Sequence, residues 1–413
     1  MDQIFGLTLS MILITRLLAW KSPMILFGAQ YMLGSVFRSN SDTYLINFSW
    51  FTMLLLVAWA MKRNQVDMDS FRLAVGNISA LRKGVLLAGF LLIMLFWLQQ
   101  ANVTSLASMK RTSTSSDLAN VANGLLNLFL SPAYAVLLFH RRGNPKWILR
   151  LSILVFAVFA FKGFLGSNRG AVLLPLLLVL YARFVQIKRW REVPKFASIL
   201  GVLTIAGLAF IADVTAQRAG SSASVGIGMF ADQLGGELGN GYSPLKDSAV
   251  LNYTAIIGPI LSPVLILAPL YGFIPRFIWA GKPDVGVGRI IGGDVFGTGG
   301  GSYDKGAGIP ISVPAEFEAI FGFGGYALGL VFVGLLVALI GILARRRPAL
   351  VVPLALIAPS VMGSDLGRLG MQFIIFTVSF LIMQRVLKLR LYHVRHVPPR
   401  VRTDQTIQLP ENV

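Results

Sequence analysis

The feature that most constrains this sequence is a series of apolar runs that are each long enough to cross a lipid bilayer. A membrane-spanning helix needs about 17 to 25 mainly apolar residues, and such runs recur from one end of the chain to the other. Hydrophobic residues make up 55% of the 413 residues and charged residues only 13%, a composition that excludes a water-soluble domain. Because backbone groups inside a bilayer must be satisfied within their own segment, the sequence predicts an all-α polytopic integral membrane protein.

Basic residues fall in clusters between the apolar runs, and their positions predict the orientation of the helices. The formal net charge is +19, and Lys and Arg next to membrane spans mark cytoplasmic loops. The clusters lie at Lys62–Lys83, Arg141–Arg150, Lys188–Lys195, Arg345–Arg347 and Arg385–Arg402. The spans that we predict between them are 42–61, 84–100, 118–139, 151–166, 171–187, 196–213, 317–343, 349–363 and 366–387. Two shorter runs, 4–20 and 22–37, come before them, so we expect about 11 to 12 transmembrane helices with the N-terminus outward.

The same alternation places four segments on the outer side of the membrane. They are 101–117, the turn LGSNRGA at 165–171, a large loop at 214–316 and the turn GSDLGRLG at 363–370. Within the large loop, Pro259, Pro263 and Pro269 interrupt an apolar stretch at 253–274, which favours a re-entrant or interfacial element over a full crossing. We therefore expect one membrane domain, 1–413, that ends in a basic cytoplasmic tail, 388–413. The sequence contains no internal repeat, which argues against an inverted-repeat transporter.

A small set of cations lies on the outer side, where the positive-inside rule disfavours them. Each could be an anchor that reaches the lipid headgroups, or the partner of an acid in the same loop. Arg169 is the strongest candidate for binding an anion, because a tight turn holds it and Lys162 lies two helical turns earlier. A bound anion would remove the cost of two cations at one end of a hairpin. The other outer cations are Arg218, Lys246, Arg276, Lys282, Arg289, Lys305 and Arg368.

The segment GFIPRFIWAGKPDVGVGRIIGGDVFGTGGGSYDKGAGIP, residues 272–310, combines an aromatic head with a glycine-rich remainder. The head has the composition of an interfacial element and presents Arg276, and the glycines allow the backbone to approach a ligand closely. A nucleotide-binding fingerprint is not supported, because no strand precedes these glycines. The next segment, PAEFEAIFGFGGYALGL, predicts a helix after Pro314. Its first turn holds Glu316 and Glu318, where the helix dipole favours carboxylates, so capping and catalysis both stay open for Glu316.

Three motifs in this order carry a resemblance to a known family. A GSNRGA turn between spans, IPRFIWAGKPDVGVGR in one large outer loop and PAEFEAIFGFGGYALGL opening the next helix resemble the Wzy-type polymerases of bacterial O-antigen and exopolysaccharide, over roughly residues 150–390. The resemblance implies a GT-C-like glycosyltransferase in the bacterial inner membrane. It would act on undecaprenyl diphosphate-linked oligosaccharide at the periplasmic face, with Arg169, Arg276 and Arg289 as catalytic residues. One departure is that the arginine-to-glycine spacing of some members recurs only at Arg289 and Gly300, inside a glycine-rich tract.

The chemistry of such a transfer suits the residues that lie on the outer side. A lipid diphosphate is already a good leaving group, so its departure chiefly requires positive charge where negative charge develops. Arginine binds phosphate oxygens in pairs, and each charge-assisted hydrogen bond contributes about 1.5 to 3 kcal/mol. The attacking sugar hydroxyl would benefit from a carboxylate base, for which we predict Glu316 and Asp365, then Asp284 and Asp294. Substrate-binding roles are predicted for Lys162, Arg218, Lys282, Asp284, Lys305 and Arg368.

The histidine positions favour a polymerase over an O-antigen ligase. The three histidines, His140, His393 and His396, all fall in predicted cytoplasmic segments, whereas O-antigen ligases, which this chain also resembles, are usually credited with an outer histidine. A flippase for the same lipid-linked sugar and a scaffold subunit remain alternatives. Without cysteines or a histidine cluster, we expect no metal and no cofactor. Topology and anionic lipid account for the basic excess without nucleic acid, so the expected partners are membrane lipids, with a chain-length regulator and a flippase as candidates.

Overall fold

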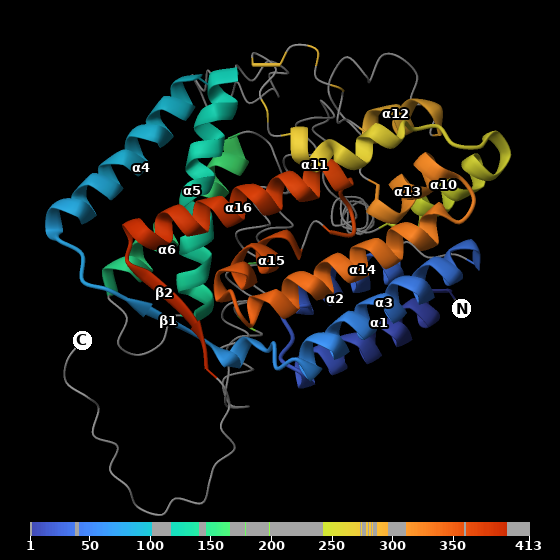
Figure 1. Ribbon diagram of the computed structural model, residues 1–413, viewed down its shortest axis with the longest axis horizontal. Helices are drawn as coiled ribbons and strands as arrows, with labels where there is room; N and C mark the ends of the chain where they lie inside the picture. The colour runs from blue at the N-terminus through green and yellow to red at the C-terminus, as the bar shows by residue number, and fades with distance from the viewer. Residues whose placement is uncertain are drawn as a thin grey trace, which may run out of the picture.

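The structure is a computed structural model in which residues 2–37, 41–100, 117–139, 146–165, 243–272, 287–295, 311–358 and 361–394 are described, with a few isolated positions between them. Most of the described residues are helical (Figure 1). Four helices in these ranges are long and apolar enough to cross a membrane, which confirms the prediction of a mainly helical membrane protein. They are α3 (Tyr44–Arg63), α4 (Ala80–Gln100), α14 (Gly325–Ala344) and α16 (Leu366–Val386).

The remaining described elements pack around these four helices. Helices α1 and α2 contact each other and α3, α3 packs on α14, and α5 lies between α4, α6 and α16. The further helices are α1 (Asp2–Ala19), α2 (Ile25–Phe37), α5 (Asp117–Phe139), α6 (Lys146–Leu165), α10 (Pro244–Ile257), α11 (Ala268–Tyr271), α12 (Val287–Asp294), α13 (Val313–Phe321) and α15 (Val351–Ile357). Short 3-10 turns are η1 (Ser41–Thr43), η2 (Met68–Ser70), η5 (Pro263–Leu267) and η6 (Pro348–Leu350).

The predicted spans 317–343 and 349–363 are wrong as single helices. The first is broken at residues 322–324 into α13 and α14, because Gly322 and Gly324 have φ of 73° and 88°, a left-handed conformation that ends a helix. In the second, the described residues form the end of η6 and α15, which has seven residues, followed by a turn from residue 361. Hydropathy failed to predict the break at 322–324 because that break depends on backbone conformation, which apolarity does not measure.

The proline-interrupted stretch 253–274 does not form one continuous helix either. It is divided into the end of α10, then η5 and α11. Helix α11 packs against the start of α16, where a side chain on Gly370 would lie 2.3 Å from Cβ of Pro269. The stretch is therefore not one continuous helix, and its role as a re-entrant or interfacial element stays a prediction.

The basic loops of the described helices meet at one end of the molecule, which we call the basic end (residues 20–22, 62–76, 345–347 and 385–394). Two strands, β1 (Phe71–Val75) and β2 (Leu389–His393), pair antiparallel there with Phe71 opposite His393, as a small two-stranded sheet in an otherwise mainly helical structure. Lys21 forms an ion pair with Asp69, and the ring of Phe71 lies 6.0 Å from that of Phe139 at the end of α5. These contacts join the α1–α2 turn, the α3–α4 loop, the end of α5 and the end of α16.

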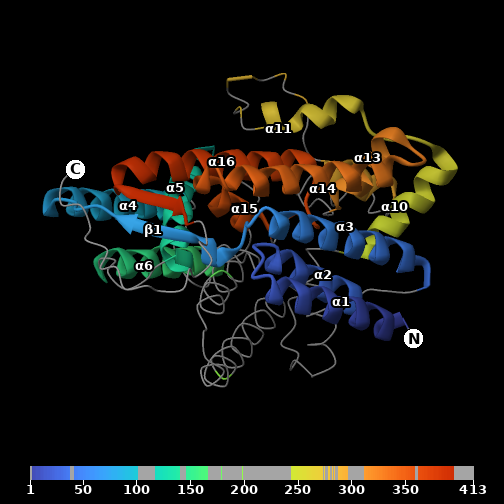
Figure 2. The ribbon, with the colours of Figure 1, turned by 60° about the horizontal axis from the view of Figure 1, so that its bottom comes forward.

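The opposite end of the same helices carries α10 and α13, and we call it the acidic end (residues 243–272, 311–326 and 361–368). Helices α3, α14 and α16 all finish at the basic end, so all three begin at or towards the acidic end. Figure 2 shows α10 and α13 beside the start of α14, far from β1. Acids outnumber cations at the acidic end, and cations outnumber acids at the basic end.

Candidate functional site

Helix α13 is buried along its length and connects three other helices through polar side chains. Residues 313–320 are all buried. Ser312, which precedes α13, binds Asp247 of α10, and Glu316 binds the backbone at the start of α16. Glu318 Oε2 accepts a hydrogen bond from the backbone N–H of Tyr326 in α14 at 2.6 Å. This buried helix therefore determines how α10, α14 and α16 are positioned at the acidic end.

Local sequence explains why α13 is short and packs tightly. Ser312 caps it by accepting a hydrogen bond from the N–H of Ala315, and Pro314 lies in its first turn, where proline is tolerated. After the turn, α14 runs back along α13 at very close range. A Cβ on Gly325 would lie 2.4 Å from the carbonyl oxygen of Phe317, and one on Gly329 would lie 2.7 Å from Cα of Pro314. Only glycine fits at these two positions.

Asp247 is the centre of a buried hydrogen-bond network that joins four elements. Its Oδ2 accepts hydrogen bonds from Ser312 Oγ at 2.7 Å and from Tyr326 Oη at 2.9 Å. The Tyr326 hydroxyl in turn accepts from Nε1 of Trp50 in α3 at 2.9 Å. Burial raises the pKa of Asp247 to about 6, and the hydrogen bonds from Ser312 and Tyr326 limit that rise. At neutral pH the carboxylate is mainly ionised and held by these donors.

Glu316 lies at the N-terminus of α16, next to Asp365. Its Oε2 accepts a hydrogen bond from the N–H of Leu366 at 2.6 Å, while Asp365 caps the same helix by accepting from the N–H of Arg368 at 2.7 Å. The other oxygen of Glu316, Oε1, is buried and has no hydrogen-bond partner among the described residues. The helix is therefore capped by two carboxyl groups, and one of them keeps an unused oxygen.

The environment of this pair raises the pKa values of both carboxyl groups. Burial raises the pKa of Glu316 to about 8; the hydrogen bond from Leu366 opposes the rise and the charge of Asp365 adds to it. Burial also raises the pKa of Asp365, against the N–H and the positive charge of Arg368. A carboxyl group with a pKa near neutral can gain and lose a proton at working pH, which is the property of a general acid or base.

Three of the residues predicted from sequence are brought together here. Glu316, Asp365 and Arg368 come from segments 50 residues apart and meet at the start of α16. Arg289 lies in α12 and Lys162 in α6, but their side chains are outside the described part. Asp294 ends α12 and is exposed. The predictions for Arg169, Arg218, Arg276, Lys282, Asp284 and Lys305, and for spans 171–187 and 196–213, lie outside the described residues.

Sequence reasoning missed the network around Asp247. Trp50 and Tyr326 are 276 positions apart, and no spacing pattern links residues so distant. A weak signal did exist, since Asp247 is the last charged residue before Arg276. An acid at the edge of a long uncharged tract is a candidate for burial, but its partners could come only from the fold.

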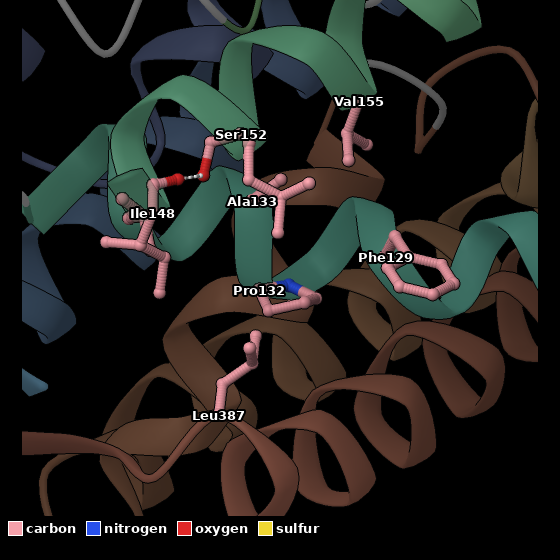
Figure 3. A pocket seen from close by; sticks show the side chains of 9 residues that line it. Phe129, Pro132, Ala133, Ile148, Ser152, Val155 and Leu387 are labelled. Atoms are coloured by element: carbon pink, nitrogen blue, oxygen red, sulfur yellow. Dashed lines mark hydrogen bonds between the residues drawn. The ribbon is translucent and has the colours of Figure 1, made fainter. Parts of the chain in front are cut away.

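A pocket lies between α5 and α6 (Figure 3), away from α13. It is lined by apolar side chains, among them Phe129, Pro132 and Val155, and is closed on one side by Leu387. Its one polar side chain, Ser152, donates to the carbonyl of Ile148 at 2.8 Å. The lining offers no charge to a phosphate or a sugar. In the part of the chain that the structure describes, no group of three or more His, Cys, Asp or Glu is placed to hold a metal ion.

Comparison with known proteins identifies no relative of this chain: no family model, no curated protein and no solved structure matches it.

Proposed function

We propose that this protein is a glycosyltransferase that polymerises lipid-linked oligosaccharide at the end of the membrane domain where Glu316 and Asp365 meet. The donor would be the growing glycan on undecaprenyl diphosphate, and the acceptor the next lipid-linked repeat unit. The observation that carries the proposal is the buried carboxyl group of Glu316, which has a pKa near 8 and a free oxygen beside a second carboxyl group. The resemblance of the sequence motifs to Wzy-type polymerases supplies the substrate class.

In the proposed reaction, a sugar hydroxyl of the acceptor attacks the anomeric carbon of the donor. A new glycosidic bond forms, the bond to the diphosphate oxygen breaks, and the lipid diphosphate leaves with the electron pair. The proton of the hydroxyl passes to the carboxylate of Glu316. A base with a pKa near the working pH suits this transfer, because it combines a useful ionised fraction with a strong tendency to take the proton.

The leaving diphosphate requires positive charge and hydrogen-bond donors. Arg368 is exposed next to Asp365 and could supply one such contact from the first turn of α16. Arg169, Arg276 and Arg289 remain the candidates that the family resemblance provides. Each can bind two phosphate oxygens at once, a geometry that lysine cannot reproduce.

The test replaces Glu316 by Gln in cells that make the polymer, followed by analysis of the lipid-linked intermediates on each face of the membrane. We expect single repeat units to accumulate on the outer face and long chains to disappear. Repeat units trapped on the cytoplasmic face would instead indicate a flippase, and finished polymer left on its carrier would indicate a ligase; either result would contradict the polymerase.

The matched control is Glu318→Gln. Glu318 is buried on the same helix, and its Oε2 accepts a hydrogen bond from the N–H of Tyr326. The amide oxygen of Gln can accept the same hydrogen bond. Polymer length should stay near normal in this variant. Equal loss of polymer in both variants, at equal protein levels, would mean that Glu316 acts only through the packing of α13.

Arginine variants test whether guanidinium groups bind the leaving diphosphate. Replacement of Arg368 or Arg169 by alanine should also leave single repeat units on the outer face. Lysine at the same position keeps the charge but loses the paired contact, so partial activity is expected. Full activity with lysine would show that two-point binding of phosphate is unnecessary.

A further inference from the structure

The acidic end carries an exposed apolar corner at the tip where α13 turns into α14. Phe323, in the turn, is 99% exposed, and Ile256 at the end of α10 is 82% exposed. Ile257 and Phe321 are also exposed. We call these four residues the apolar corner. Large apolar side chains that are this exposed on one protrusion require an explanation.

Backbone contacts hold the two parts of the corner together. The N–H groups of Ile260 and Leu261 both donate to the carbonyl of Ala319, at 2.8 and 2.9 Å. A Cβ on Gly322 would lie 3.3 Å from the ring of Pro259. These contacts fasten the end of α10 to the end of α13, and they place Ile256 and Ile257 on the same corner as Phe321 and Phe323.

The corner continues the lipid-facing surface of a membrane-spanning helix. On α14, exposed side chains recur at Leu328, Val331, Leu335 and Leu339, a spacing that forms one helical face. Helix α14 has 20 residues, or about 30 Å at 1.5 Å per residue, which equals the thickness of the hydrocarbon core. Phe323 precedes its first residue by two positions, so it falls at the boundary between hydrocarbon and headgroups.

Charge also favours lipid over protein or water as the neighbour of the corner. No charged residue occurs between Asp247 and Arg276, or between Glu318 and Arg345. Protein interfaces are normally surrounded by a polar rim, and solvated loops normally carry charge. Amphipathic elements at a membrane surface instead bury Phe and aliphatic side chains about 5 to 10 Å into the headgroup and acyl boundary.

We propose that the apolar corner is an interfacial anchor, which inserts Phe323, Phe321, Ile256 and Ile257 into the lipid leaflet at the acidic end. The anchor fixes the depth of the α13–α14 turn in the bilayer. This inference does not depend on the proposed glycosyltransferase activity, because it rests on exposure and on the length of α14.

The experiment uses the absence of cysteine from the chain. A single Phe323→Cys variant is labelled with an environment-sensitive fluorophore and reconstituted in phosphatidylcholine–phosphatidylglycerol vesicles. The vesicles contain lipids spin-labelled either near the headgroup or near the middle of the acyl chain. Leu335→Cys, in the middle of α14, is the control for a deep position, and Arg390→Cys, exposed on β2 at the basic end, is the control for water. Because Phe323 is almost fully exposed, its replacement leaves the core intact.

The expected result is stronger quenching at position 323 by the shallow lipid label than by the deep one, with the reverse order at position 335. Aqueous iodide should quench position 390 strongly and position 323 weakly. Strong iodide quenching at position 323 would overturn the anchor by showing that the corner is in water. Protection from iodide and from both lipid labels would also overturn it, since a second protein surface would then cover the corner.

Discussion

Charged side chains are mainly exposed at one end of this helical bundle, whereas carboxyl groups are buried at the other. At the basic end most charged groups are exposed, as in the ion pair of Lys21 and Asp69, whose side chains are 60% and 26% exposed; Asp67, which is 8% exposed, is an exception. At the acidic end the carboxyl groups of Asp247 and Glu316 are buried and held by hydroxyl or backbone N–H donors. Exposed cations next to membrane spans determine orientation, whereas buried acids cost stability and are retained where they are needed for structure or chemistry.

This difference teaches that the number of charges at an end says little about where function lies. The basic end has the larger charge, but most of its charged side chains are exposed. The acidic end has fewer charges; Asp247, Glu316 and Glu318 are enclosed by packed helices, whereas Arg368 is exposed. Variants at matched positions should therefore have small effects at the basic end and large effects at the acidic end.

The largest effect on stability is expected for Gly329→Ala. The new Cβ would lie 2.7 Å from Cα of Pro314 and 2.8 Å from Cβ of Phe317, so α13 would have to move away from α14. We expect destabilisation of about 3 kcal/mol, measured by thermal unfolding in detergent micelles. Gly89→Ala in α4 is the control, because no atom lies within 4 Å of its new Cβ. A helix-interior Gly→Ala there should stabilise by about 0.5 to 1 kcal/mol; equal effects would disprove the tight α13–α14 contact.

Asp247→Ala should be the next most severe change. It removes the acceptor of two buried hydroxyl groups, those of Ser312 and Tyr326, and an unsatisfied buried donor costs about 1 to 3 kcal/mol. We expect a loss of about 2 to 3 kcal/mol in the same unfolding measurement. Asp247→Asn, which retains an acceptor oxygen, should lose clearly less. If the two variants were equally stable, the hydrogen bonds to Asp247 would not support this end.

Glu316→Gln tests the buried carboxyl group through pH. Between the ordinary pKa of 4.5 and the raised value of about 8, the folded protein keeps a proton on Glu316 that the unfolded chain releases. Stability of the native protein therefore falls as pH rises through this window, and Gln, which cannot ionise, removes that loss. The variant should be similar to the native protein at pH 4 and clearly more stable than it at pH 9. A difference that does not change with pH would place the pKa of Glu316 at an ordinary value.

The smallest effect is expected at the basic end, for Asp69→Asn. The pair with Lys21 is partly exposed, and such surface ion pairs contribute about 0 to 1 kcal/mol and weaken with salt. Thermal unfolding should change by less than 1 kcal/mol, and less still at high salt. A loss as large as that of Asp247→Ala would contradict the contrast between the two ends.

The sequence by itself determined that this protein lies in a lipid bilayer and that its basic residues form clusters between the membrane spans. Apolar runs of spanning length can be satisfied only as helices in a bilayer, and the described basic clusters then meet at one end. The residue types of Glu316, Asp365 and Arg368 also marked them as candidates before their contacts were known.

Only the tertiary structure decided where the span 317–343 breaks and which acids share a site. Gly322 and Gly324 end a helix through backbone conformation, a property that hydropathy does not measure. Glu316 and Leu366 are 50 residues apart, and Asp247 and Tyr326 are 79 apart. Contacts over such separations depend on how the helices pack, because a side chain binds what lies next to it in space and no local pattern of residues specifies that neighbour.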